Sequence, residues 1–554
     1  MAAPGNSFVD ATYASALEQI AGQHGNREAL VFRQERYSFA EVKRRVCEAS
    51  RRFVALGLTR GDRVALWLPN QPEFLWCWLG ASQLGLVTVV LNTRLKLPEV
   101  RYQLAQSEST VIVVPGRGAF RDFLAEVAEL CPEITGQPFD GPATAELPHL
   151  RRVVVLGSGP DVPGIVTWPD FDTASPDSGP LPFAADPDEP ALISYSSGTT
   201  ALPKGALITH CVWRKAYDIG DRADLTADDR LYLCIPLFGS MAMMNGVLPF
   251  WTRGAAIVLE ERFDPSTFME RVETERCTAA HLLPPMIEAL VASPERARFD
   301  LSSLRIGWVL SSDRRILDMV AHDLAIPGVM TGYGMTETTT VLTRNRWDDP
   351  LEVRITTQGY ALPDVELRII DPATEQELPT GETGEIWARG YCIMPGYFKK
   401  PEESARALTA DGWFKTGDSG SLDETGRLSF RGRIGDGYKS RGFNVSPAEI
   451  EAVLIEHPDI DAAAVVGVPH PRLGQVGIAF VVPASGRSPA PAALRAYLKP
   501  LLSSFKIPEL IQVVPELPLT AGTGKVQKFR LREEGERLLA REAQDEARPV
   551  SVAS

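Results

Sequence analysis

The chain has 554 residues and a formal net charge of −14, with 44% apolar and 23% charged residues. One hydrophobic core does not extend over this length, so at least two domains are expected in an ordinary globular protein. The negative charge argues against nucleic acid as the main partner, because polyanions are bound by basic surfaces. An anionic substrate would therefore have to be held by local basic groups.

The N-terminus and the cysteines indicate a cytoplasmic protein. The first residues show neither the basic region nor the apolar region of a signal peptide. The most apolar stretch, residues 74–91, contains Ser82, Gln83 and two glycines, which predicts a buried helix passing into a strand rather than a membrane span. Seven scattered cysteines without C-x-x-C spacing predict free thiols and no zinc site.

Strand and helix patterns alternate from residue 28 to residue 115, which predicts α/β layers. A connection rich in Gly, Pro, Asp and Ser follows at residues 157–189, and the alternation then resumes. Strands are predicted at residues 63–68, 191–194, 231–235, 255–259 and 306–310, and helices at residues 266–276 and 314–324.

Residues 195–205 read Tyr-Ser-Ser-Gly-Thr-Thr-Ala-Leu-Pro-Lys-Gly and follow one of these predicted strands. Hydroxyls and bare backbone N–H groups in such a loop can wrap the oxygens of a polyphosphate. The spacing is not that of a Walker loop, and a polar surface turn is the alternative. The candidate phosphate-binding residues are Ser196, Ser197, Gly198, Thr199, Thr200 and Lys204.

A second polar stretch, residues 331–338, combines glycines with an aromatic ring. The glycines beside Tyr333 let the backbone approach a flat ligand, on which the ring can stack. Thr336 can donate to a phosphate, and Glu337 can hold Mg²⁺. Asp418, at the end of a predicted strand, can accept hydrogen bonds from ribose hydroxyls. The candidate residues of the stretch are Gly332, Tyr333, Gly334, Met335, Thr336 and Glu337.

Glycines at residues 432–437 mark a boundary between two structured regions. Beyond it, Ser446 and Glu449 form the pattern of a capping box, with proline at the first helical position. Strands are predicted at residues 463–468, 478–482 and 510–514 and a helix at residues 490–503, which together make a small α+β unit. Its last feature is a loop from Pro518 to Lys525.

With these motifs in this order, residues 30–528 resemble the adenylate-forming superfamily of acyl-CoA synthetases, luciferases and nonribosomal adenylation domains. The resemblance implies a large N-terminal domain of α/β layers with a β-barrel-like part, residues 1–433. It also implies a small mobile α+β domain, residues 434–554, joined by a hinge. The motifs that carry it are residues 195–205, 236–238, 333–338, 416–418, 432–433 and 524–525. Residues 394–397 and 443–449 look like those of fatty or aryl acyl-CoA synthetases, which favours coenzyme A as the thiol.

The resemblance implies a two-step reaction. A carboxylate attacks the α-phosphorus of MgATP to give an acyl-adenylate and pyrophosphate, and a thiol then attacks the acyl carbonyl and expels AMP. It places Tyr333 at adenine, Thr336 at the α-phosphate, Glu337 at Mg²⁺, Asp418 and Arg433 at ribose, and Lys525 between the carboxylate and the α-phosphate. Thr336, Glu337 and Lys525 are thus the candidate catalytic residues. Rotation of the small domain would bring up the candidate CoA-binding residues Lys439, Arg441, Gly442 and Phe443.

The predicted acyl pocket has no large gate. Gly239 follows the Pro236–Phe238 motif, where related enzymes usually have a histidine, and loss of an imidazole enlarges the cavity. Met243 is either an adaptable pocket wall or a plain core residue, and His281 is either a pocket residue or a satisfied core histidine. A bulky, largely apolar carboxylic acid is therefore predicted. The candidate pocket residues are Phe238, Gly239, Met243, His281, Ser311, Ser312, Asp313 and Gly334.

Three departures from the family pattern touch adenylation or the hinge. Ala201 replaces a usual glycine, Gly435 replaces a usual aspartate, and six residues instead of five separate Pro518 from Lys525. One inserted residue can shift a side chain by about 3.3–3.6 Å, whereas a misplacement of about 1 Å can cost a hundredfold in rate. Adenylation is therefore expected to be weak or lost, with the adenylate supplied by a partner ligase. The alternatives are an ordinary two-step enzyme, an enzyme that loads a carrier protein, and a non-catalytic protein that binds adenylate or CoA.

Overall fold

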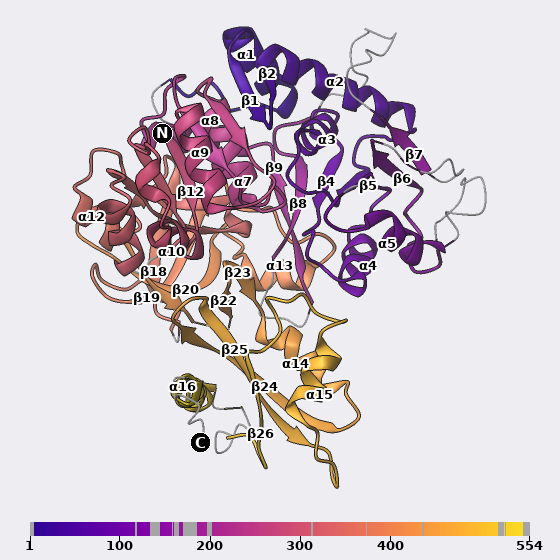
Figure 1. Ribbon diagram of the computed structural model, residues 1–554, viewed down its shortest axis with the longest axis vertical. Coiled ribbons are helices and arrows are strands. Elements are labelled where there is room, and N and C mark those ends of the chain that lie inside the picture. Colours follow the sequence, from indigo (N-terminus) through magenta and orange to yellow (C-terminus); the bar gives the residue numbers. More distant parts are fainter. Residues whose placement is uncertain are drawn as a thin grey trace, which may run out of the picture. The chain divides into compact units, whose positions relative to one another are not determined.

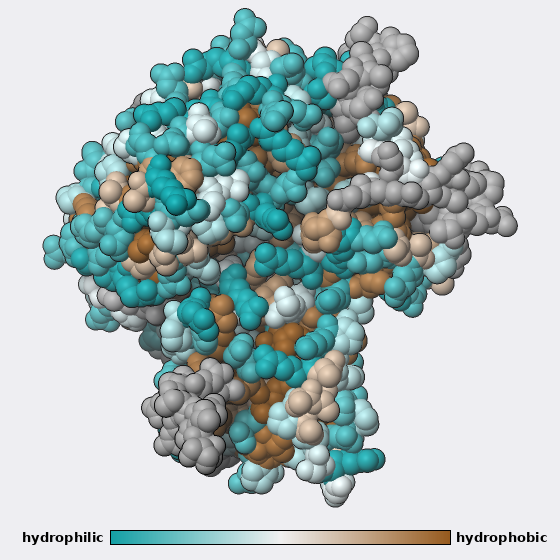
Figure 2. Space-filling model, in the orientation of Figure 1, coloured by the Kyte–Doolittle hydropathy of each residue, from teal (hydrophilic) through white to brown (hydrophobic). Residues whose placement is uncertain are grey.

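The computed structural model describes residues 5–116, 119–132, 144–157, 159, 165–169, 185–196, 202–311, 314–372, 374–434, 437–518, 526 and 528–546. The chain forms two compact units (Figure 1). The large unit comprises residues 1–93, 100–195 and 205–432, and the small unit comprises residues 94–99, 196–204 and 433–554. Hydrophilic residues cover most of the visible face of the large unit (Figure 2). The expected pivot of the chain near residue 433 stays a prediction.

Seven strands form the first sheet of the large unit, in the order β14–β13–β12–β10–β11–β1–β2. Neighbours run parallel except for β1 and β2. Strands β11, β12 and β13 are buried at every position, as is usual in parallel sheets covered on both faces. The bounds are β1 Glu28–Phe32, β2 Glu35–Ser38, β10 Arg230–Leu233, β11 Ala256–Leu259, β12 Ala279–Leu282, β13 Ile306–Val309 and β14 Gly328–Met330.

A second seven-stranded sheet has the order β7–β6–β5–β3–β4–β8–β9. The apolar stretch at residues 74–91 forms helix α3, Pro72–Ser82, followed by β4, as predicted. The strands are β3 Arg63–Leu66, β4 Val87–Val90, β5 Val111–Pro115, β6 Arg152–Leu156, β7 Ile165–Trp168, β8 Pro190–Ser196 and β9 Lys204–Thr209.

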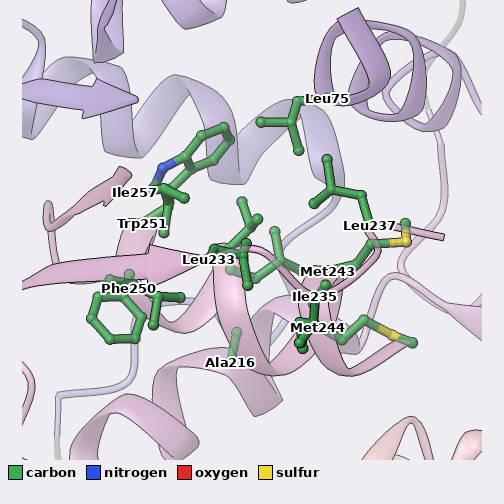
Figure 3. Close-up of a cluster of buried hydrophobic side chains, with 14 of the residues drawn as sticks. Leu75, Ala216, Leu233, Ile235, Leu237, Met243, Met244, Phe250, Trp251 and Ile257 are labelled. Carbon is green, nitrogen blue, oxygen red and sulfur yellow. The ribbon is translucent and has the colours of Figure 1, made fainter. Parts of the chain in front are cut away.

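Helices alternate with these strands, and apolar side chains from both form one extended core, part of which is shown in Figure 3. The helix predicted over residues 314–324 begins as α11, Arg314–Asp318, and continues as a π-helix, η4, Met319–Asp323. Within the described residues, no helix is both long and apolar enough to cross a membrane. The remaining helices are α1 Tyr13–His24, α2 Phe39–Ala55, α4 Leu97–Gln106, α5 Phe123–Leu130, α6 Val212–Arg222, α7 Ser240–Ala242, η2 Met243–Val247, α8 Leu248–Trp251, α9 Pro265–Glu275, α10 Pro284–Ala292, η3 Arg296–Arg298, η5 Thr336–Thr338, α12 Leu351–Thr356 and α13 Pro401–Ala407.

Two antiparallel sheets complete the large unit, in the orders β15–β16–β17 and β18–β19–β20–β21. Their bounds are β15 Gly332–Met335, β16 Thr340–Arg344, β17 Tyr360–Ala361, β18 Val365–Ile370, β19 Gly384–Gly390, β20 Phe414–Leu422 and β21 Leu428–Arg433.

The small unit is a five-stranded sheet with helices on both faces. Alternate residues of β25 enter separate cores, Ala479 with α14 and α15, and Ile478 with α16, because strand side chains point to opposite faces. The capping box predicted at Ser446 is wrong: Ser446 precedes the helix without a side-chain capping bond, and Glu449 accepts a hydrogen bond from the Lys506 ammonium at 2.7 Å. The elements are β22 Tyr438–Ser440, β23 Phe443–Val445, α14 Pro447–Ile455, β24 Ile460–His470, β25 Gly474–Pro483, α15 Pro491–Leu498, β26 Leu510–Val513 and α16 Lys528–Glu546.

Candidate functional site

The β15–β16 hairpin carries the candidate adenine and phosphate residues. Its strands pair antiparallel, with Gly332 opposite Arg344. A Cβ added at Gly334 would overlap the carbonyl oxygen of Thr340, and one at Gly332 would lie 2.5 Å from the Thr343 carbonyl oxygen. The close approach of the neighbouring strand therefore requires these glycines, whereas the sequence pattern suggested the approach of a ligand.

Tyr333 and Asp418, predicted separately from the sequence, lie together. The Tyr333 side chain is 5% exposed, and its hydroxyl donates a hydrogen bond to Asp418 Oδ2 at 2.9 Å. The ring stacks on Phe430 with centroids 5.5 Å apart and planes inclined by 27°. The Asp418 backbone N–H donates to Thr416 Oγ1 at 3.1 Å. An oriented ring and carboxylate of this kind can hold a base and a ribose.

Glu337 lies on the η5 turn that Thr336 begins, directly after β15. Its carboxylate oxygen Oε1 accepts a hydrogen bond from the Tyr397 hydroxyl at 3.0 Å, and its carbonyl oxygen accepts one from the Met394 N–H at 2.9 Å. Mg²⁺ in nucleotide sites binds one or two carboxylates together with phosphates and water, so this oriented carboxylate fits such an ion. No cluster of three or more His, Cys, Asp or Glu side chains that could hold a metal lies among the described residues.

Lys215 lies beneath this turn and is a residue that sequence reasoning missed. It is 1% exposed on the buried face of α6, and its ammonium donates to the carbonyl oxygen of Thr338. Burial lowers the pKa of Lys215. The next residues, Thr339 and Thr340, have positive φ angles of 52° and 76°, which β-branched residues rarely adopt. Lys215 thus supports a strained turn beside Glu337, and its signal in the sequence was a charge among apolar helical positions.

Several candidate site residues lie outside the described part of the chain, so their roles stay predictions. They are Ser197, Gly198, Thr199, Thr200, Ser312, Asp313 and Lys525, together with Ala201, Gly435 and residues 519–524. Ser196 is the last residue of β8, Lys204 the first of β9 and Arg433 the last of β21. Described elements therefore border both the predicted phosphate loop and the predicted hinge.

The candidate CoA residues lie on the β22–β23 hairpin of the small unit. Ser440 pairs with Phe443, and the two loop residues, Arg441 and Gly442, have φ angles of 52° and 84°. Two positive φ angles are typical of the type I′ turn that matches strand twist. The turn leaves Lys439 and Arg441 exposed, while Phe443 stacks on Phe505 with centroids 4.5 Å apart.

The candidate acyl-pocket residues occupy different environments. Phe238 and Gly239 precede α7, and Gly239 has φ −84° and ψ 134°, which any residue can adopt. The nearest atom to a Cβ added there would be the Pro236 carbonyl oxygen, at 3.2 Å. Met243, by contrast, is fully buried in the π-helix η2 and packs in the core cluster of Figure 3. Ser311 lies just beyond β13.

His281 belongs to a group of three buried side chains, two on neighbouring strands of the first sheet and one on β16 of another sheet. It lies on β12 directly opposite Trp308 on β13, with ring centroids 4.9 Å apart, and the guanidinium carbon of Arg344 lies 4.3 Å from the Trp308 ring centre. The three residues are 1%, 1% and 3% exposed, in that order. Burial lowers the pKa of Arg344 to about 9; burial and the Arg344 charge lower that of His281 to about 3. Sequence reasoning missed Trp308 and Arg344, which belong to no motif.

Known proteins resemble the chain over nearly its whole length. The family model described as AMP-binding enzyme matches residues 17–398, and the one described as AMP-binding enzyme C-terminal domain matches residues 449–525. A methyl-dioxo-octahydro-indenyl propanoyl:CoA ligase of Mycobacterium tuberculosis is 34% identical over 95% of this chain and 99% of its own. A feruloyl-CoA synthase of an Amycolatopsis species is 33% identical over 89% of this chain and 93% of its own.

A solved structure shows the same architecture. The amide bond synthetase McbA from Marinactinospora thermotolerans superposes with a TM-score of 0.80 at 27% identity, covering 95% of this chain and 99% of that one. The predicted α/β fold, with a large N-terminal and a small C-terminal domain, is therefore confirmed. The chain belongs to the AMP-binding enzymes, in the acyl-CoA ligase branch of the adenylate-forming superfamily.

Proposed function

We propose that the chain converts a bulky carboxylic acid to its CoA thioester through an acyl-adenylate. In the first step a carboxylate oxygen of the acid attacks the α-phosphorus of ATP, and pyrophosphate leaves. In the second step the CoA thiol attacks the acyl carbonyl, its proton is released, and AMP leaves. The observation that carries this proposal is the hydrogen bond between Tyr333, on the strand β15 that runs into the Glu337 turn, and Asp418 on β20, within an AMP-binding fold.

The candidate site residues have separate roles in this proposal. The Tyr333 ring supports the adenine, and its hydroxyl orients Asp418, whose carboxylate accepts hydrogen bonds from the ribose. Glu337 would hold Mg²⁺, which when bound neutralises charge on the phosphates, while Thr336 contacts the α-phosphate. Lys525 stabilises the charge that develops during adenylation, a contribution of about 2.7–4 kcal/mol for one donor in a preorganised site.

The acid is proposed to be bulky because Gly239 leaves its position without a side chain at the start of α7. Relatives support this size class, since one is named for a methyl-dioxo-octahydro-indenyl propanoyl group and another for a feruloyl group. The match with this chain covers 99% of the first relative and 93% of the second.

We also propose that adenylation is the weaker half-reaction. The support is the sequence: Ala201 in the phosphate loop, Gly435 at the hinge and the additional residue before Lys525. Each change falls on a segment that handles ATP or repositions the small domain in the proposed cycle. A partner ligase would then supply the acyl-adenylate.

ATP–pyrophosphate exchange and thioester formation, measured on one panel of bulky acids, test these proposals separately. Thioester formed from acid, ATP and CoA supports the two-step ligase. Thioester formed only from synthetic acyl-adenylate supports weak adenylation, which rapid exchange would contradict. If neither the acids nor their adenylates give a thioester, the ligase proposal is wrong.

A further inference from the structure

The group formed by His281, Trp308 and Arg344 holds a surplus of buried hydrogen-bond donors. Among the described residues, five of its side-chain nitrogens are buried without a hydrogen-bond partner, two from His281, one from Trp308 and two from Arg344. Buried polar groups in folded proteins are almost always hydrogen-bonded, so these five require an explanation. We name the three residues the donor cluster.

The chemistry of the donor cluster defines what it can bind. Indole and guanidinium nitrogens only donate, and a neutral imidazole provides one donor and one acceptor. With a pKa of about 3, His281 is neutral at pH 7. The nearby Asn245 backbone acts in the opposite direction and raises this pKa, but neither imidazole nitrogen meets the geometry of a hydrogen bond. Arg344 stays charged at pH 7. The complement of the cluster is therefore a group rich in lone pairs and negative in charge, such as a carboxylate, which can bind a guanidinium bidentately.

The position of the cluster in the fold also points to a ligand. His281 and Trp308 lie near the carboxyl ends of the parallel strands β12 and β13, the edge at which open α/β sheets bind ligands. Arg344 ends β16, opposite Gly332 on the strand of the adenine candidate Tyr333. The π-helix η2 borders the imidazole, since a Cβ added at Gly246 would lie 3.3 Å from His281 Cε1. π-Helical turns occur frequently at functional sites.

We propose that the donor cluster binds an oxygen acceptor at the far end of the acyl substrate, and that a second carboxylate is its strongest ligand. This inference rests on the proposed function, because it describes the acid of that reaction. The Trp308 ring face stabilises the Arg344 cation in part, but it supplies no lone pair to the N–H groups. The substrate class is thus a bulky acid bearing a second carboxylate or a ketone. The dioxo group in the name of the Mycobacterium tuberculosis relative is of this chemical kind.

Three acids with one bulky frame test the proposal, their far ends carrying a carboxylate, a methyl ketone or an ethyl group. Calorimetry on the full chain without ATP or CoA measures binding, and kcat/KM for the thioester is measured in parallel. The carboxylate acid should bind at least about tenfold more tightly than the ethyl acid, with the ketone between them, as hydrogen bonds to charged groups predict. Arg344→Met should remove that preference.

Arg354→Met is the matched control. Arg354 is also buried, but its guanidinium donates to the carbonyl oxygens of Asp349 and Pro327, both at 3.0 Å, and of Val329 at 3.4 Å. Loss of the Arg354 guanidinium should leave the ratio of the binding affinities for the carboxylate and ethyl acids unchanged. Trp308→Phe keeps an aromatic ring and removes one donor, so it should lower the affinity ratio between the carboxylate acid and the ethyl acid about threefold. It provides a second test should Arg344→Met not fold.

The possible outcomes separate this inference from the proposed function. The inference is overturned if the wild type prefers the ethyl acid, or if the affinity ratio between the carboxylate and ethyl acids is unchanged in both Arg344→Met and Trp308→Phe. The donor cluster would then bind water or a small ion instead. If the three acids bind in the expected order but none gives a thioester, the inference stands and the proposed function is wrong.

Discussion

The proposed adenylate end of the large unit (Tyr333, Glu337 and Thr338) and its proposed acyl end (the donor cluster) are both buried, but they differ in how their polar groups are satisfied. At the adenylate end, the Tyr333 hydroxyl, the Glu337 carboxylate and the Thr338 carbonyl each have a partner within the chain. At the acyl end, within the described residues, the nitrogens of the donor cluster have none. The β15–β16 hairpin contributes a residue to each end, Tyr333 to the first and Arg344 to the second. We infer that the groups serving the reaction common to the family are already hydrogen-bonded in the unliganded protein, whereas the groups that recognise one acid form their hydrogen bonds only when that acid binds.

Two buried arginines show the same contrast. Arg354 donates to three backbone carbonyl oxygens, which is how a structural arginine satisfies its charge. In the part of the chain that the structure describes, Arg344 Nε and Nη1 have no hydrogen-bond partner, and the guanidinium lies over the Trp308 ring. Proteins depart from full polar satisfaction mainly at functional sites, and Arg344 belongs to the cluster proposed to bind the far end of the acid.

Removing a charge from the adenylate end is expected to have the largest effect. Glu337→Gln keeps the size of the side chain and an acceptor for the Tyr397 hydroxyl, but removes the carboxylate proposed to hold Mg²⁺. ATP–pyrophosphate exchange should fall by about 100- to 1000-fold, as when a preorganised site loses one stabilising group. Tyr397→Phe removes only the hydrogen bond and should cost about tenfold or less. Equal losses from both variants would mean that Glu337 has only a structural role.

Lys215 tests whether the adenylate end depends on its buried support. Lys215→Met leaves the Thr338 carbonyl oxygen without its donor, so the free energy of unfolding should fall by about 1–3 kcal/mol. Displacement of the Glu337 turn should also lower kcat by about tenfold to a hundredfold and raise the Mg²⁺ concentration that gives half-maximal exchange. Lower stability with an unchanged Mg²⁺ dependence would restrict Lys215 to a structural role.

The acyl end should make the protein sensitive to acid. Folded His281 has a pKa of about 3 against an ordinary value of 6.5, so the unfolded chain takes up the proton first. The stability present above pH 6.5 is therefore lost as the pH falls toward 3. At pH 5 the loss from this one group is about 2 kcal/mol.

Urea unfolding at pH 7 and pH 5 measures this loss, and His281→Leu should abolish its share. His210, whose pKa burial lowers to about 4 and whose Nδ1 accepts the Tyr13 N–H at 3.0 Å, contributes with the same sign. His210→Asn, which keeps an acceptor, is therefore a comparison variant. Identical acid sensitivity of His281→Leu and the wild type would contradict the assignment.

The smallest effect is expected at Gly239, a candidate residue of the acyl pocket. Gly239→Leu places a side chain where the φ and ψ angles suit any residue, although its Cβ would lie 3.2 Å from the Pro236 carbonyl oxygen, so the free energy of unfolding is measured alongside KM. The KM for a bulky acid should rise about tenfold, the usual effect of a modest change in an apolar pocket, with a smaller change for acetate. An unchanged KM for the bulky acid would argue against a role of residue 239 in the pocket.

Most of the fold was predictable from local patterns, whereas the acyl end was not. The α3–β4 segment and the strands β10, β11 and β13 of the first sheet follow from apolar patterns. The helix at residues 314–324 was predicted without its π-helical half, because a π-turn has no distinct periodicity. The capping box failed because Glu449 pairs with Lys506, a tertiary contact that no local pattern encodes.

The site divides in the same way. Tyr333, Glu337 and Asp418 lie in motifs, so the sequence alone predicted them as site residues. Arg344 and Trp308 come from separate strands and become meaningful only through a contact of 4.3 Å. In the sequence alone, a lone arginine that ends a strand of threonine, valine and leucine carries no distinguishing signal.

The most direct test is the stability of the unliganded protein at pH 7, measured as the free energy of unfolding of Arg344→Met, Arg354→Met and the wild type. The account predicts that Arg344→Met is as stable as the wild type or more so, because it removes a buried charge without a counter-charge. Arg354→Met should lose about 1–3 kcal/mol, because it leaves backbone carbonyls unsatisfied. If Arg344→Met loses as much stability as Arg354→Met, then Arg344 is a structural residue and the acyl end is not completed by the substrate.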